Sequence, residues 1–180
     1  MTPIEFCEVT LRNAVAEILI LKYGDEWFSH PTLKRALTLN KLKELELVIE
    51  KFKTQGVEFG SDDIVASMNL SFWEHFLSKK FYSTIWRGQV SYIFPYMEEK
   101  IEEAEFLEKL RLAVNAVRKI RNRIAHHEEI VFKHKLGQRY TECLFVVRSR
   151  SMTTLKLLEE SQQVVTCLME RKNFKNLSVL

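Results

Sequence analysis

Residues that interrupt helices are scarce in this chain. Only five glycines and three prolines occur among 180 residues. Because glycine and proline disfavour helix interiors and favour turns, their scarcity predicts long helices joined by short loops. Hydrophobic residues make up 46% and charged residues 28%, which suits a globular domain with one sizeable core. We therefore expect an all-α helical bundle that forms a single domain over residues 1–180.

Capping and stop signals outline the helices. Thr2 and Glu5 have the spacing of a capping box, and Gly24 marks the end of a helix that begins at Pro3. Ser71 and Glu74 have the same spacing. Further helices are predicted over about 32–55, from 61 onward, and over 71–80, 98–130, 138–149 and 152–172. A short strand over 143–147 is the alternative for that segment.

Aromatic residues are dense between positions 72 and 94. They are Phe72, Trp73, Phe76, Phe81, Tyr82, Trp86, Tyr92 and Phe94. Such rings can stack on RNA bases. In a small helical domain, however, aromatic residues at this density mostly form the core, and we expect that role here.

Positive charge is concentrated in one stretch, although the chain has a net charge of only +3. Residues 118–139 hold seven Lys or Arg and two Glu, a local charge of +5. The basic residues are Arg118, Lys119, Arg121, Arg123, Lys133, Lys135 and Arg139. A local positive field attracts phosphate groups even when the whole protein is nearly neutral. The stretch is therefore either a surface for nucleic acid or an ordinary solvated basic face.

The apolar stripe of the helix predicted over 98–130 becomes polar near its end. Read in sevens, one row is Leu107, Val114, Arg121 and Glu128, and a neighbouring row is Phe106, Ala113, Ile120 and His127. A polar group that enters an apolar seam without a partner costs about 1–3 kcal/mol. The end of this helix is therefore expected to face a solvated cleft or to hold a polar network.

The sequence Arg-Asn-Arg-Ile-Ala-His over 121–126 resembles the HEPN motif, in which an arginine and a polar residue precede a histidine. The longer string 121–128, which ends Ala-His-His-Glu, resembles the Abi-like (abortive infection) branch of that superfamily. Upstream, the segments 63–66 and 70–73 and the later Trp86 are similar to the preceding helices of the family. Ser71 stands where the family often has glycine. The resemblance covers about residues 30–135.

This resemblance implies a HEPN-like bundle that pairs two-fold and cleaves RNA without a metal or other cofactor. RNA supplies its own nucleophile, the 2′-OH, so the enzyme must move protons and stabilise a charged phosphorane. Imidazole has an ordinary pKa of about 6.5 and can act as base or acid near neutral pH, and arginine matches phosphate oxygens with a bidentate fork. The expected products carry a 2′,3′-cyclic phosphate and a 5′-hydroxyl.

The site residues follow from the motif. We expect Arg121, His126 and Asn122 to be catalytic, with His127 and Glu128 as candidate catalytic or supporting residues. The expected RNA-binding residues are Arg118, Lys119, Arg123, Lys133 and Lys135. His126 is preferred to His127 because it stacks over Asn122 on a regular helix, whereas His127 continues a core row. Arg121 and His126 lie about 140° apart on an ideal helix. We therefore expect the reaction in a cleft shared by two protomers.

Other interpretations of the same residues remain open. The Arg121 region could be a structural network at a helix end, or the chain could be a HEPN-like module that binds RNA or protein without cleaving it. A metal site from His126, His127, Glu129 or His134 is disfavoured, because adjacent histidines point about 100° apart on a helix. The three cysteines (Cys7, Cys143 and Cys167) lie in apolar surroundings typical of inert, buried thiols.

The composition also bounds location and partners. An odd number of widely spaced cysteines suits a reducing cytoplasm. The chain shows no secretory leader and no apolar stretch of membrane-spanning length, so no membrane association is expected. The family association with phage defence and toxin–antitoxin systems implies an antitoxin or another regulatory protein as a further partner.

Overall fold

The computed structural model describes residues 1–130 and 135–177, with side chains up to residue 170. This part of the chain is all-α and contains no strand. The longer helices are α1 (Pro3–Tyr23), α3 (Leu39–Gln55), α7 (Glu103–Ala125), α8 (Leu136–Arg150), α9 (Met152–Ser161) and α10 (Val164–Leu177). The shorter ones are α2 (Pro31–Ala36), α4 (Ser61–Ser67), α5 (Leu70–His75), α6 (Val90–Ile93), and the single turns η1 (Trp27–Ser29), η2 (Lys79–Phe81) and η3 (Tyr82–Trp86).

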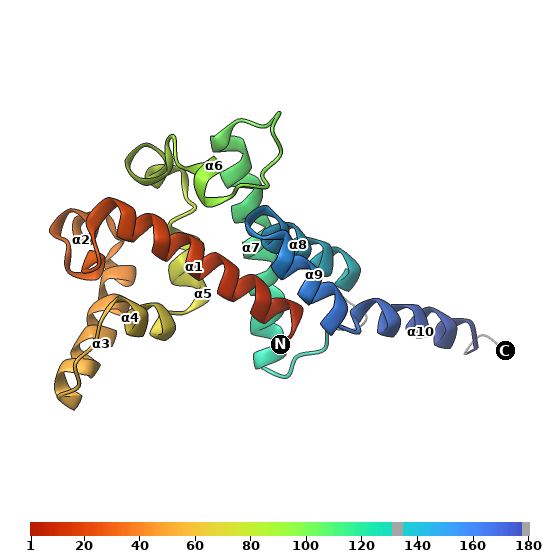
Figure 1. Cartoon of the computed structure of the whole chain (residues 1–180). Helices are drawn as coiled ribbons and strands as arrows, with labels where there is room; N and C mark the ends of the chain where they lie inside the picture. The colour runs from red at the N-terminus through yellow and green to blue at the C-terminus, as the bar shows by residue number, and fades with distance from the viewer. Residues whose placement is uncertain (131–134, 178–180) are drawn as a thin grey trace.

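Helices α1, α7 and α8 form the centre of the molecule. Helix α8 packs along both α1 and α7, and α5 packs against the same two helices. In Figure 1, α1 crosses the middle of the view, α3 and α4 form an arm at one end, and α10 extends from the other. None of the helices in the described residues combines the length and apolar character needed to cross a membrane.

The predicted caps of α1 are confirmed. The Thr2 side chain accepts from the Glu5 N–H, the Glu5 carboxylate accepts from the Thr2 N–H, and Gly24 ends the helix. The predicted helix 32–55 is interrupted instead of continuous, because Leu37 and Thr38 are extended between α2 and α3. The strand considered for residues 143–147 is wrong, since these residues lie inside α8.

Helix α5 begins differently from the prediction. The cap is Asn69, whose side chain accepts from the Phe72 N–H at 3.0 Å, and not Ser71. Ser71 instead donates its hydroxyl to the Asn69 side chain. Glu74 is thereby free of any capping role and turns toward α7.

The aromatic segment forms the core, as predicted. Six of its rings are buried: Phe72, Trp73, Phe76, Phe81, Trp86 and Phe94. Tyr82 is partly buried, and Tyr92 is exposed. The buried indole N–H groups are satisfied locally, since Trp86 donates to the Phe76 carbonyl at 2.8 Å and Trp73 to the Met68 carbonyl at 3.3 Å. These rings therefore hold the short central helices together and are not available to stack on bases.

Candidate functional site

Helix α7 changes character over its last turn. One face is buried from Phe106 to Ile120, where it packs in the core. Beyond Ile120 the residues up to Glu129 are exposed, except for the half-buried Arg123. The apolar stripe thus ends where the motif begins, and the motif projects from the core into solvent.

The helix ends in a Schellman motif. The His127 N–H donates to the Ile124 carbonyl at 3.0 Å, and the Glu128 N–H donates to the Arg123 carbonyl at 2.9 Å. This pattern requires a left-handed residue at the first position after the cap, which is usually glycine. Here that residue is His127, with φ of +55°. Gly56, with φ of +64°, ends α3 in the same way without strain.

The early helix end corrects the predicted helix 98–130, which spans only Glu103–Ala125. Residues 98–102 form a turn before Glu103, and the left-handed conformation of His127 prevents a further helical turn. His127 consequently does not continue the buried row of Ile120 and is exposed. His126, by contrast, still donates its N–H to the Asn122 carbonyl at 3.0 Å, so the turn between these two residues is closed.

We expect His127→Gly to stabilise the protein by about 1 kcal/mol, because glycine adopts positive φ without the clash between Cβ and backbone. This should raise the melting temperature by roughly 2–4 °C in a chain of this size, measured by circular dichroism. His126→Gly is the matched control. His126 has φ of −94°, so glycine relieves no strain there and should lower the melting temperature. Equal shifts for both variants would contradict the strain at His127.

The two arginines of the motif each lie near a carboxylate. Arg121 lies near Glu8 of α1, with 3.9 Å between Nε and Oε2, and Arg123 donates to Glu128 at 2.8 Å. The return of the chain at His127 brings Glu128 back to Arg123. In the described residues, no side-chain hydrogen bond joins any two of Arg121, Asn122, His126 and His127.

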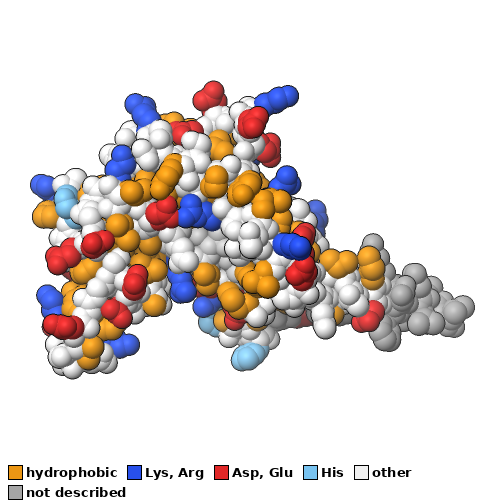
Figure 2. Space-filling model, in the orientation of Figure 1, with side chains coloured by type: hydrophobic (Ala, Val, Ile, Leu, Met, Phe, Trp, Pro, Cys, Tyr) orange, Lys and Arg blue, Asp and Glu red, His pale blue; other side chains and the backbone are white. Residues whose placement is uncertain are grey.

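The other predicted RNA-binding residues differ in their surroundings. Arg118 is half-buried and bound to Glu74 of α5, whereas Lys119 and Lys135 are exposed. Lys133 lies outside the described residues. Figure 2 shows histidine and basic side chains at the lower edge of the molecule, where α7 ends in Figure 1. The surface is indented between this edge and the arm formed by α3 and α4.

Three residues near the site were missed from the sequence. Glu8 contacts Arg121, and Glu74 accepts hydrogen bonds from both Arg118 and Asn115 of α7. Glu74 is separated from Arg118 by 44 residues, and Glu8 is still farther from Arg121. Only the packing of α1 and α5 on α7 brings these carboxylates to the motif helix, and no local pattern signals it.

A metal centre receives no support from the geometry. Within the described ranges, no group of three or more His, Cys, Asp or Glu side chains is placed to hold an ion. His127 is itself the left-handed residue at the helix end, and His134 lies outside the described residues.

Two of the cysteines are buried as predicted, but the third is not. Cys7 and Cys143 lie in the core, whereas Cys167 on α10 is exposed. The hydrogen bond with the Cys143 thiol and burial raise the pKa of the Cys7 thiol well above its ordinary value. A thiol held protonated is a poor nucleophile, so Cys7 is not a catalytic candidate.

His75 is unsuited to acid catalysis. It packs edge-on against Phe81, with ring centroids 5.2 Å apart. Burial, with the nearby Lys80 and Lys41, lowers the pKa of His75 to about 4. Its imidazole is therefore neutral at physiological pH.

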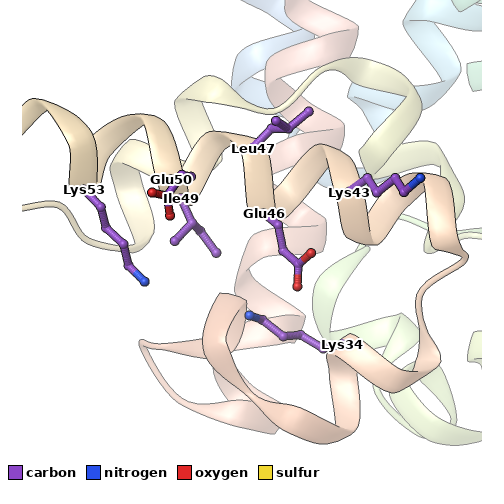
Figure 3. A pocket seen from close by; sticks show the side chains of 7 residues that line it. All are labelled: Lys34, Lys43, Glu46, Leu47, Ile49, Glu50 and Lys53. Atoms are coloured by element: carbon purple, nitrogen blue, oxygen red, sulfur yellow. The ribbon is translucent and has the colours of Figure 1, made fainter.

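A separate hollow lies between α2 and α3. It measures about 530 Å³ and is lined by Lys34, Lys43, Glu46, Leu47, Ile49, Glu50 and Lys53. In Figure 3 the Lys34 side chain of α2 reaches toward Glu46 of α3. No motif residue lines this hollow. Its open wall carries lysine and glutamate side chains around Leu47 and Ile49.

Comparisons with protein-family models, curated proteins and solved structures found no match to the chain. The resemblance to Abi-like HEPN proteins therefore depends on the motif residues of the sequence alone.

Proposed function

We propose that this protein is a metal-independent endoribonuclease of HEPN type, with its site at the C-terminal end of α7. The observation that supports this most is the exposure of the motif. One face of the helix is buried through Ile120, and the next seven residues present Arg121, Asn122 and His126 to solvent within two turns. A purely structural network would bury these groups against partners, whereas a phosphate substrate needs them accessible.

The roles follow from the chemistry of each group. Arg121 binds the phosphate and stabilises the charge of the phosphorane. His126 transfers the proton of the 2′-OH or protonates the leaving 5′-oxygen. Asn122, one turn below His126, orients the imidazole or the phosphate by hydrogen bonds. His127 and Glu128 support the helix end, and Glu128 also holds Arg123.

One protomer supplies a single Arg/His set, whereas proton removal and proton delivery need two groups. We therefore place the reaction between two copies of the chain, each contributing the end of its α7. A cytoplasmic location, phage defence or a toxin–antitoxin system, and an antitoxin or other regulatory protein as partner complete the proposal. The cytoplasmic location is inferred from the number and spacing of the cysteines, and the other parts come from the family resemblance.

The test uses the full chain and a mixed RNA substrate in EDTA. We expect the wild type to cut RNA into fragments with 2′,3′-cyclic phosphate and 5′-hydroxyl ends, and Arg121→Ala/His126→Ala to produce none. Lys109→Ala is the matched control, because Lys109 is an exposed cation on α7 outside the basic stretch. This variant should cleave RNA at the wild-type rate. Light scattering should give a mass above the 21.3 kDa of one chain.

Two outcomes would contradict the proposed metal-independent ribonuclease activity. Dependence on added metal would contradict the metal-free mechanism. Retention of RNA by the wild type and the double variant, with cleavage by neither, would favour the alternative of a HEPN-like binding module for RNA or protein.

A further inference from the structure

The hydrogen bonds of Glu74 join α5 to the motif helix. Its Oε1 accepts from the Asn115 amide at 2.8 Å, and its Oε2 accepts from Nε of Arg118 at 2.5 Å. Both carboxylate oxygens thus accept hydrogen bonds from side chains on one face of α7. The Glu74 side chain is only 12% exposed. A carboxylate this buried is stable only when it is paired, so the arrangement holds Arg118 in one position.

Arg118 keeps binding capacity after this pairing. A guanidinium has five N–H donors in a planar fork, and Glu74 takes the one on Nε. In the described residues, no side-chain hydrogen bond uses the Nη groups of Arg118. The Arg118 side chain is 28% exposed. An arginine fixed on one edge and open on the other can bind a phosphate at little further cost in side-chain entropy.

The position of Arg118 relates it to the motif. Arg118 and Asn122 are four residues apart on α7, so they share a face and are separated by about 6 Å along the axis at a rise of 1.5 Å per residue. In the proposal that follows, Arg118 takes a phosphate other than the one at Arg121 and His126. It would belong to a neighbouring nucleotide of the same strand.

We propose that Arg118 forms a subsite for a phosphate that flanks the cleaved linkage, and that Glu74 is the positioning residue that sets its geometry. This inference rests on the proposed function and predicts that the enzyme prefers RNA chains longer than a dinucleotide. Arg111 shows the contrast on the same helix, since Glu108 accepts from both its Nε and its Nη2. Glu108 thus takes two of the five donors of Arg111, whereas Glu74 takes one of the five of Arg118.

The test compares kcat/KM on a diribonucleotide, which has one phosphate, and on a hexaribonucleotide. We expect the wild type to have a higher kcat/KM on the hexamer than on the dinucleotide. E74Q and R118A should lower kcat/KM on the hexamer by about ten-fold, as expected for the loss of one charged hydrogen bond. Their losses on the dinucleotide, which carries no flanking phosphate, should be smaller than their losses on the hexamer. E108Q, the matched control, should keep the full preference for the hexamer.

A second measurement separates this subsite from the cleavage reaction. A DNA hexamer lacks the 2′-OH nucleophile, so its binding can be followed by fluorescence polarisation at several salt concentrations. R118A should lower the salt slope by about 0.7, the value for one phosphate contact on a single strand. If the wild type cleaves no RNA, the proposed function fails and this slope still tests the subsite.

The outcomes that overturn the subsite are specific. The subsite is contradicted if R118A keeps both the wild-type preference for the hexamer and the wild-type salt slope. It is also contradicted if E74Q loses kcat/KM equally on both substrates, which is the result expected if Glu74 only stabilises the fold. If E74Q melts below the assay temperature, R118A decides, because it leaves Glu74 bonded to Asn115.

Discussion

Replacing His126 with alanine is expected to slow RNA cleavage by about 10²–10⁴-fold, the usual contribution of one general acid or base. The loss should appear in kcat, since the imidazole acts in the transition state and adds little to substrate binding. The proposal prefers His126 to its neighbour, and the two residues differ in backbone position. His126 closes the last turn above Asn122, whereas His127 has already left the helix.

His127→Gly is the comparator for this prediction. It removes the neighbouring imidazole while preserving the left-handed conformation that residue 127 must adopt. Cleavage by this variant should remain within a few-fold of wild type, measured as initial rates on one labelled RNA. Full activity of His126→Ala, or loss of activity only in His127→Gly, would show that catalysis does not depend on His126.

The fold class was predictable because it depends on local signals. Adjacent residues indicate the cap of α1 at Thr2, its end at Gly24 and the end of α3 at Gly56, and the structure confirms all three. The end of α7 was not predictable in this way. Its left-handed residue is a histidine where glycine is usual, so the sequence carries no stop signal at that position.

The surroundings of the site were even less accessible from the sequence. The position of the motif along the chain could be found, because Arg121 and His126 are close in sequence. The pairing of Arg118 with Glu74 could not, since the spacing of Ser71 and Glu74 predicts a capping box and therefore a different role for Glu74. The alternative cap at Asn69 releases Glu74, and only the packing of α5 on α7 decides where it goes.

The largest loss of stability is expected for Trp86→Ala, at about 3–5 kcal/mol of the free energy of unfolding. The Trp86 side chain is fully buried, packs against Phe94 with ring centroids 5.9 Å apart, and donates its indole N–H to the Phe76 carbonyl. Alanine would leave a large cavity and an unsatisfied carbonyl. Because domains of this kind have a total stability of about 5–15 kcal/mol, this one change should remove much of it.

Denaturation in urea, followed by circular dichroism, would measure the effect as a lower midpoint. Tyr92→Ala is the matched control from the same aromatic segment, since Tyr92 is 62% exposed and its removal should change stability by less than about 0.5 kcal/mol. A loss below about 1 kcal/mol for Trp86→Ala would contradict the core assigned to these rings.

Trp86→Phe separates the two contributions of the indole. Phenylalanine keeps an aromatic ring against Phe94 but removes the donor to the Phe76 carbonyl, so its cost should be about 1–3 kcal/mol. The difference in unfolding free energy between the phenylalanine and alanine variants then measures the packing of the ring. If the two variants were equally unstable, the hydrogen bond would account for most of the stabilisation by Trp86. The segment between α5 and α6 would then be held by the Phe76 carbonyl more than by its buried aromatic rings.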